Sequence, residues 1–179
     1  MARQLRLARA LAPRAPSHAA LQWPVERPCY AFPPQAPVLQ HARFCGTRPR
    51  SWESPGLTET DETLDLLRAA GVEYVADWVI DDLPQDIDTP HGTITTLPYT
   101  VETNDIAVHA LQGHRADEFY TRGRDQFDRL HAEGADNARV MAISIHPYVT
   151  GVPHRIGYLE RLLDHVAGTE GVVWMTASQ

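Results

Sequence analysis

The sequence predicts an α/β fold, either a parallel sheet or a barrel, and three observations support this. From Gly46 onward, segments with the helical period of apolar residues alternate with short segments rich in β-branched and aromatic residues. Most linkers between these segments are short, which is typical of helices and strands that pack in layers. The chain has 179 residues, 43% of them hydrophobic, which suits one domain with a packed core.

Helices are expected at 58–71, 116–134 and 155–168, because apolar residues recur on one face of each. Thr58 or Thr60 is a suitable N-cap for the first helix, and Gly71 is a suitable residue to end it. The faces expected to turn inward are Phe119, Gly123, Phe127 and Leu130 in the second helix, and Ile156, Leu159, Leu162, Leu163 and Val166 in the third.

Strands are expected at 72–80, 139–146 and 171–176, and an extended segment followed by a loop at 92–105. The first strand stops at Asp81-Asp82, and the second ends in His146. In parallel α/β folds the working groups lie at the carboxyl ends of strands. His146 and the two aspartates are therefore candidate functional residues.

Composition excludes several classes of partner. The net charge is −7, with no basic cluster outside the first residues, which argues against nucleic acid or an anionic membrane as a partner. No run of 18 apolar residues predicts a membrane span. Cys29 and Cys45 form no disulfide framework and match no metal-ligand spacing, so we expect a reducing, cytoplasmic location.

Residues 1–45 differ in composition from residues 46–179, which are expected to form the folded domain. The first segment has six Arg, seven of the fourteen Pro and one acidic residue, Glu26. Proline interrupts helices and central strands, so we expect a disordered segment. Its Arg-rich, acid-poor start also permits an alternative interpretation as an organelle transit peptide.

Each candidate site residue has a functional and a structural interpretation. His146 is either a general acid–base or a histidine that hydrogen-bonds a loop carbonyl. Asp77, inside the strand 72–80, either faces the site or points outward on a half-exposed strand. Asp81 and Asp82 either bind polar groups or a cation, or begin a solvated loop. Trp78 is either a core residue or a platform for substrate.

A second set of candidates lies in loops. Glu102 and Asp105, in the stretch VETND, are either polar ligands for a substrate or turn residues. Arg155 either holds an anionic group or begins a helix. The sequence has no glycine-rich phosphate loop, no G-x-S-x-G and no H-E-x-x-H, so residue patterns alone name no substrate.

Three stretches resemble the polysaccharide deacetylase (NodB-homology) family. They are GTRPRSWESPGLTETDETLDLLRAAGVEYVADWVIDDLP at 46–84, LPYTVETND at 97–105 and ISIHPYVTGVPHRI at 143–156. The most similar branch is the intracellular one that includes metal-independent allantoinases and related amide hydrolases. The similarity runs from about Gly46 to the C-terminus, and SPGLTET together with HPYVTGVPHR is its specific signature.

This resemblance implies a partial (β/α) barrel of the NodB-homology type that lacks its first strands. It also implies hydrolysis of a carbon–nitrogen bond in a small-molecule amide or an N-acetyl sugar. His146 matches the family's histidine that protonates the leaving group, and Asp77 matches the aspartate that accompanies it. Trp78 and Pro84 match residues that line the pocket, and Tyr148, in the same motif as His146, is expected to contact substrate.

Two departures from the family pattern affect the prediction. Glu53 stands two residues before Pro55, where the family usually has an arginine. Residues 1–60 contain no aspartate, whereas the family carries its catalytic base on the first strand. His18 and His41 do not form the H-x-x-x-H pair that holds the metal in metal-dependent members, so no metal cofactor is expected.

These departures suggest that residues 1–45 are a frame-shifted translation or a replaced N-terminus, joined near Cys45 to a family C-terminal portion. The chain alone is then expected to be an impaired hydrolase. The alternative is a non-catalytic remnant or interaction module, and a metal-binding domain ranks last. An exposed sheet edge is expected to favour self-association.

Overall fold

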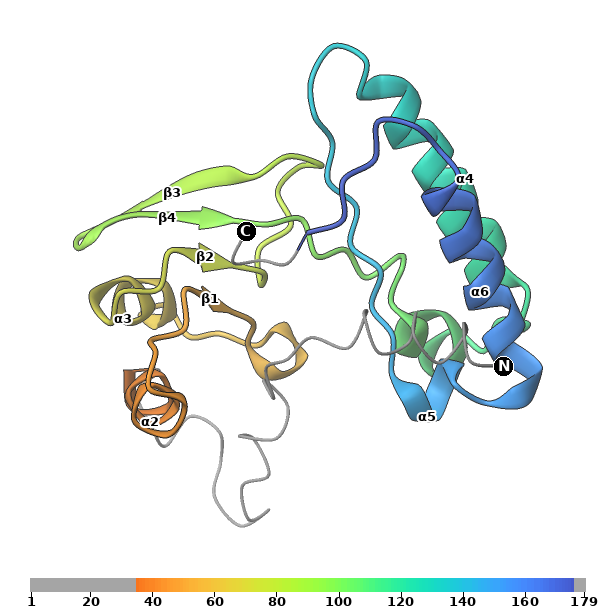
Figure 1. Ribbon diagram of the computed structural model, residues 1–179. Helices are drawn as coiled ribbons and strands as arrows, with labels where there is room; N and C mark the ends of the chain where they lie inside the picture. The colour runs from red at the N-terminus through yellow and green to blue at the C-terminus, as the bar shows by residue number, and fades with distance from the viewer. Residues whose placement is uncertain (1–34, 176–179) are drawn as a thin grey trace.

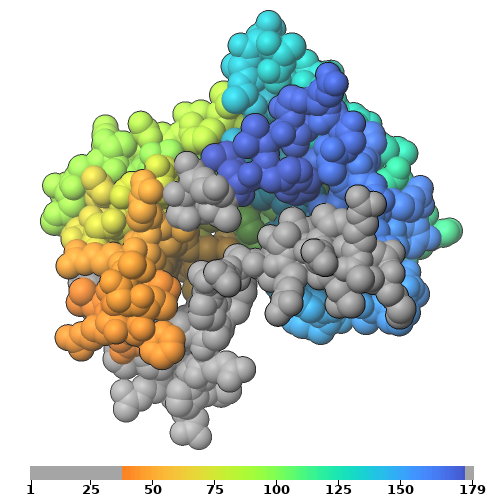
Figure 2. All heavy atoms as spheres, viewed as in Figure 1, coloured from red at the N-terminus to blue at the C-terminus, as the bar shows by residue number. Residues whose placement is uncertain are grey.

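A computed structural model of the chain describes residues 35–175. A small sheet with two helices packed against it lies beside a pair of long antiparallel helices (Figure 1). Space-filling atoms place residues of the sheet and its helices, orange to green, on one side and the long helices, cyan to blue, on the other (Figure 2). The elements, in chain order, are α2 Gln35–Cys45, β1 Ser51–Trp52, η3 Pro55–Leu57, α3 Thr63–Ala69, β2 Tyr74–Val75, β3 Gln85–Thr89, β4 Gly92–Thr96, η4 Ile106–Leu111, α4 Glu118–Glu133, α5 Pro147–Thr150 and α6 Pro153–Ala167.

The sheet has the strand order β1-β2-β4-β3. β1 pairs with β2, and β2 with β4, in parallel, whereas β3 and β4 form an antiparallel hairpin. Gly92 closes the hairpin with a φ of 105°, a backbone conformation that favours glycine. Because the three parallel strands point the same way, the loops that follow them all leave the sheet at the C-terminal ends of the strands (Figure 1). We call this end of the sheet the strand-end rim.

One hydrophobic core joins the sheet to α2 and α3. Alternation along β2 and β4 turns one set of side chains toward these helices, and the β-branched residues of that set are fully buried. The buried members are Val38, Leu67, Ala70, Val72, Val75 and Ile94. Gly71 ends the turn after α3 with a φ of 91°, as the sequence predicts for its helix C-terminus.

A second core lies between α4 and α6, and the apolar faces that the sequence predicts to turn inward meet there. Gly123 packs closely against α6, since a Cβ at this position would lie 2.6 Å from Leu162 Cδ2. The buried members are Val108, Phe119, Phe127, Leu159, Leu162 and Val166.

The structure corrects several predicted elements. Residues 35–45 form α2, so the expectation of disorder through residue 45 is wrong for this part; Pro37 lies near the helix start, where no intrahelical N–H bond is lost. The rest of that prediction, for residues 1–34, lies outside the described residues. The helix expected from residue 58 begins at Thr63, and neither predicted cap residue caps it.

The predicted strands are shorter or absent. The strand expected at 72–80 is limited to Tyr74–Val75, because the chain bends where the Asp77 carboxylate bonds another loop. Residues 85–89, for which no element was predicted, form β3. Residues 139–146 are extended but form a single bridge, at Ser144, and the Val140 amide donates instead to the Asp82 carbonyl. Residues 171–175 form no strand, and Trp174 and its neighbours are exposed.

Gly123→Ala is expected to lower the free energy of unfolding by about 1 kcal/mol, although alanine has the higher helix propensity. The new Cβ would force Leu162, which is fully buried, out of its place, at a cost of about 1–3 kcal/mol. The control is Gly157→Ala in α6, where a Cβ meets nothing within 4 Å and should stabilise by about 0.5–1 kcal/mol. Urea denaturation of both variants measures the difference, and equal effects would contradict the close packing of α4 on α6.

Candidate functional site

The candidate site forms where the turn at 101–103 meets the extended segment that ends at His146. Asn104 and Ser144 form a parallel bridge. The Ser144 amide donates to the Thr103 carbonyl at 3.0 Å, and the Asp105 amide donates to the Ser144 carbonyl at 3.1 Å. These bonds bring Asp105, which precedes η4 with a helical backbone, close to the segment that ends in His146.

The Asp105 carboxylate holds His146 through two hydrogen bonds. Its Oδ1 accepts from His146 Nδ1–H at 2.7 Å, and its Oδ2 accepts from the His146 backbone amide at 2.7 Å. The Thr150 hydroxyl also donates to Oδ2, at 2.6 Å. Asp105 is fully buried, and burying a carboxylate is costly unless donors satisfy its oxygens, which these three do.

This contact determines which ring nitrogen of His146 is available. An ionised carboxylate only accepts hydrogen bonds, so the ring proton of neutral His146 lies on Nδ1. The His146 side chain is 28% exposed, whereas that of Asp105 is not exposed at all. Nε2 is therefore the nitrogen that can exchange a proton with a bound molecule.

The turn after His146 is ordered by short-range contacts. Pro147 begins α5, where its lack of an N–H costs nothing. The ring of Tyr148 packs edge-on against His146 with 5.6 Å between the centroids, and Tyr148 is 72% exposed. Arg155 donates to the Val149 carbonyl at 3.0 Å and so ties α6 to α5. Arg155 therefore has a structural contact beside its predicted role in binding.

Tyr99 connects the Asp105–His146 pair to the loop after β1. Burial raises the pKa of Tyr99, the neighbouring Ser144 opposes the rise, and the negative charges of Glu53 and Asp105 add to it. Tyr99 is therefore a neutral hydrogen-bond donor at physiological pH. Glu53, at the position where the family usually has arginine, lies at this rim and forms a hydrogen bond with Tyr99.

A second group of polar side chains joins the loops after β1 and β2. The Ser54 amide donates to Asp77 Oδ1 at 2.7 Å, and the Trp78 indole N–H donates to Glu59 Oε2 at 2.7 Å. The carboxyl group of Glu59 lies in contact with that of Asp77, and each has a buried oxygen with no N–H or hydroxyl donor among the described residues. Burial and then this contact with Asp77 raise the pKa of Glu59 to about 8.

The structure gives Asp77, which was matched to the aspartate that accompanies His146, other partners. Asp105 is the carboxylate that touches His146, because the bridge at Ser144 aligns these segments, whereas Asp77 is held by Ser54 and Glu59. Asp105 is also buried among protein donors, contrary to its expected direct contact with substrate. A catalytic role for Asp77 stays a prediction.

Three predicted substrate residues line one open groove of about 550 Å³. Asp81 and Asp82 contribute from the loop after β2, and Glu102 from the segment before Asp105. The lining carries four carboxylates and one guanidinium, so the groove is acidic. Its remaining residues are Val79, Ile80 and Thr100, with Gln126, Arg129, Leu130 and Glu133 from α4.

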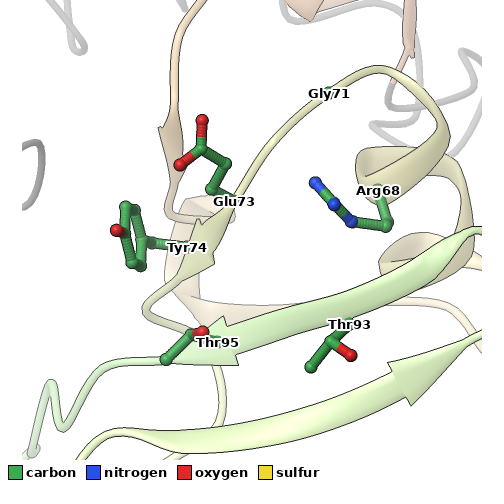
Figure 3. A pocket seen from close by; sticks show the side chains of 6 residues that line it. All are labelled: Arg68, Gly71, Glu73, Tyr74, Thr93 and Thr95. Carbon is green, nitrogen blue, oxygen red and sulfur yellow. The ribbon is translucent and has the colours of Figure 1, made fainter.

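The other predicted substrate residues lie outside this groove. Pro84 is exposed just before β3, and Trp78 is 48% exposed beside Glu59. A smaller hollow of about 330 Å³ lies at the opposite end of β2 and contains none of the predicted site residues (Figure 3). It is lined by Arg68, Gly71, Glu73, Tyr74, Thr93 and Thr95.

Two residues at the rim were not predicted from the sequence, Glu59 and Tyr99. Glu59 looks like an ordinary acid in the first turn of a helix, because the predicted helix begins one residue before it. The actual helix begins at Thr63, which leaves Glu59 in a loop facing Asp77. Glu59 would have been identified as a loop residue if the start of the helix had been predicted correctly. Tyr99 gives no local signal, since its partners Glu53 and Ser144 are distant in sequence.

No protein-family model matches the chain. A protein of Schizosaccharomyces pombe named as a polysaccharide deacetylase is 30% identical over 157 residues, which cover 79% of this chain and 49% of that protein. The crystal structure of Puue allantoinase matches with a TM-score of 0.72 and 27% identity, over 80% of this chain and 48% of that one. A protein of Pseudomonas aeruginosa PAO1 named as a polysaccharide deacetylase matches with a TM-score of 0.71 and 26% identity, over 80% and 48%.

A further crystal structure, of a Mycobacterium smegmatis protein named as a polysaccharide deacetylase, shares the fold with a TM-score of 0.68 at 18% identity. The resemblance to polysaccharide deacetylases and allantoinase is therefore confirmed, and so is the partial α/β fold of that type. The chain spans about half the length of these relatives.

The described residues do not fit a metal centre. Within residues 35–175 no group of three or more His, Cys, Asp or Glu side chains is placed to hold a metal ion. The same residues include no helix with the length and hydropathy that crossing a membrane requires.

The Asp105–His146 contact predicts that neutral His146 carries its proton on Nδ1. In Asp105→Asn the amide oxygen should stay with the two donors at the Oδ2 position, so the amide nitrogen would face Nδ1 and move the ring proton to Nε2. Nitrogen-15 NMR of labelled histidine distinguishes the two forms. Thr150→Val, which removes a donor and leaves Oδ1 in place, should keep the proton on Nδ1. A wild-type proton on Nε2 would contradict the assigned contact.

Proposed function

We propose that this chain provides the proton-donating part of an active site that hydrolyses an amide or a similar carbon–nitrogen bond. The observation that supports this most directly is the pairing of His146, partly exposed, with the buried Asp105. Relationship to polysaccharide deacetylases and allantoinase supports the reaction class. His146 is proposed as the general acid, and Asp105 as the residue that positions it.

In the proposed reaction water has added to the amide carbon, and the carbon–nitrogen bond of the tetrahedral intermediate breaks. The leaving nitrogen takes the Nε2 proton of the imidazolium form of His146, because an unprotonated amine anion is a poor leaving group, and the ring is left neutral with its proton on Nδ1. Asp105 keeps the ring in the orientation that exposes Nε2, and its charge stabilises the imidazolium form. None of residues 35–175 is assigned as the base that activates water.

The acidic groove, which Glu102 lines three residues before Asp105 in the chain, favours a neutral or cationic substrate. Its four carboxylates, Asp81, Asp82, Glu102 and Glu133, would repel an anion, and Arg129 offsets only one of them. Its volume of about 550 Å³ lies within the range for small-molecule sites. A small-molecule amide or a neutral N-acetyl sugar fits these features. Cytoplasmic location, self-association and independence from metal stay predictions.

Exposed apolar residues favour the alternative of an interaction module. Trp78, Val79 and Ile80 follow one another at the rim and are 48%, 45% and 59% exposed. Consecutive exposed apolar residues often mark a surface that contacts another protein. An interaction module would keep this surface without needing the reactive nitrogen of His146.

His146→Gln is expected to lower the rate of amide hydrolysis by about 10²–10⁴-fold, the usual contribution of a general acid. The control is His165→Gln, because His165 also pairs with an aspartate, Asp128, but on the surface where α4 meets α6. Release of acetate from N-acetylglucosamine oligomers and of allantoate from allantoin gives the rates for the full chain.

Equal losses in the two variants, or no hydrolysis by the wild-type chain with any amide tested, would overturn the proposed reaction. The second result would favour the interaction module.

A further inference from the structure

Glu59 and Asp77 are in contact at the strand-end rim, and the proposed role of His146 as general acid assigns no function to this contact. Each carboxyl has one oxygen held by an N–H group: Trp78 donates to Glu59, and Ser54 donates to Asp77. The other two oxygens, Glu59 Oε1 and Asp77 Oδ2, are buried and receive no N–H or hydroxyl donor from the described residues. These two oxygens are therefore the atoms through which the two carboxyl groups can bond to each other.

Such a contact requires a proton. Two ionised carboxylates are acceptors only and repel at short range, so side chains in this arrangement share one proton between them. With that proton in place, each buried oxygen has a partner and the pair carries one negative charge. The shared proton then links the loop after β1 to the segment after β2.

We propose that Glu59 is a positioning residue whose proton, shared with Asp77, fixes these two loops and the Trp78 side chain at the strand-end rim. The link is reinforced from β4, because the Thr96 hydroxyl donates to the Trp78 carbonyl. Strands β1, β2 and β4 thus all contribute to one polar cluster. Its effect on catalysis rests on the proposed function, whereas the shared proton does not.

The charges around Glu59 agree with this assignment. Asp77 is the charged group that acts on Glu59 from β2, and the Trp78 indole is a neutral donor that favours the ionised form. Glu53, on the loop after β1, acts on Tyr99 instead. Thr96 on β4 carries no charge. Burial and Asp77 outweigh the indole, which raises the pKa of Glu59 to about 8.

The sign of the pH effect follows from this raised pKa. The unfolded chain loses the Glu59 proton near its ordinary pKa of 4.5, whereas the folded chain keeps it until about pH 8. The folded state therefore binds more protons across this window, and its stability falls as pH rises from about 4.5 to about 8. Above that window Glu59 is ionised, no proton remains between the two side chains, and the link between the loops is lost.

Glu59→Gln tests the shared proton, because its amide can donate permanently to Asp77 while its carbonyl accepts from Trp78. The measurement is the indole N–H resonance of Trp78 from pH 6 to 10 in the full chain, assigned by its loss in Trp78→Phe. In wild type the resonance should shift with a midpoint near 8. In Glu59→Gln the shift should vanish, and unfolding by urea at pH 9 should need a higher concentration than in wild type.

Glu62→Gln is the matched control, since Glu62 is exposed at the start of α3 and its substitution should leave the wild-type titration intact. A Trp78 resonance that is constant with pH in wild type, or that still titrates in Glu59→Gln, would overturn the proposal. Neither readout requires activity, so failure of the proposed hydrolysis is recognised separately. If hydrolysis is measurable, its decline near pH 8 should also vanish in Glu59→Gln.

Discussion

The buried carboxylate of Asp105 is the contact on which the rest of the candidate site depends. It lies with no exposed surface among three donors, two from His146 and one from Thr150. A buried charge with missing partners would cost several kcal/mol, on the order of 3–5, so backbone and side chains must hold this geometry together. The bridge between Asn104 and Ser144 brings the partners into register. The exposed nitrogen of His146 is a consequence of that arrangement.

The sheet contributes to the site by directing three loops to the same rim. β1, β2 and β4 run parallel, so Glu59, Asp77 and Tyr99 leave the sheet at one end despite their distance in sequence. Burying a charged group at this rim is costly, and each of the three acidic side chains avoids that cost in a different way. Asp105 is satisfied by donors, Glu59 takes up a proton, and Tyr99 stays neutral. The acids in the open groove remain in contact with water.

Sequence patterns predicted the helices better than the strands, for a physical reason. Helical bonds are local, so the apolar stripe of α4 and the glycine after α3 could be identified directly. Strands depend on distant partners, and segment 139–146 has the composition of a strand but meets a partner at a single bridge. His146 was predicted because a motif places it at a strand end. Its partner Asp105 depends on contacts 41 residues apart, which no local pattern reveals.

The central claim is that Asp105 and His146 act as one unit, and a double-mutant cycle on the free energy of unfolding tests it most directly. The free energy would be measured for wild type, Asp105→Ala, His146→Ala and the double variant by urea denaturation. A hydrogen bond to a buried charge predicts that the double variant loses less than the sum of the single losses, by at least about 1 kcal/mol. Losses that add to within about 0.3 kcal/mol would contradict the account, because they would mean that the two side chains do not interact.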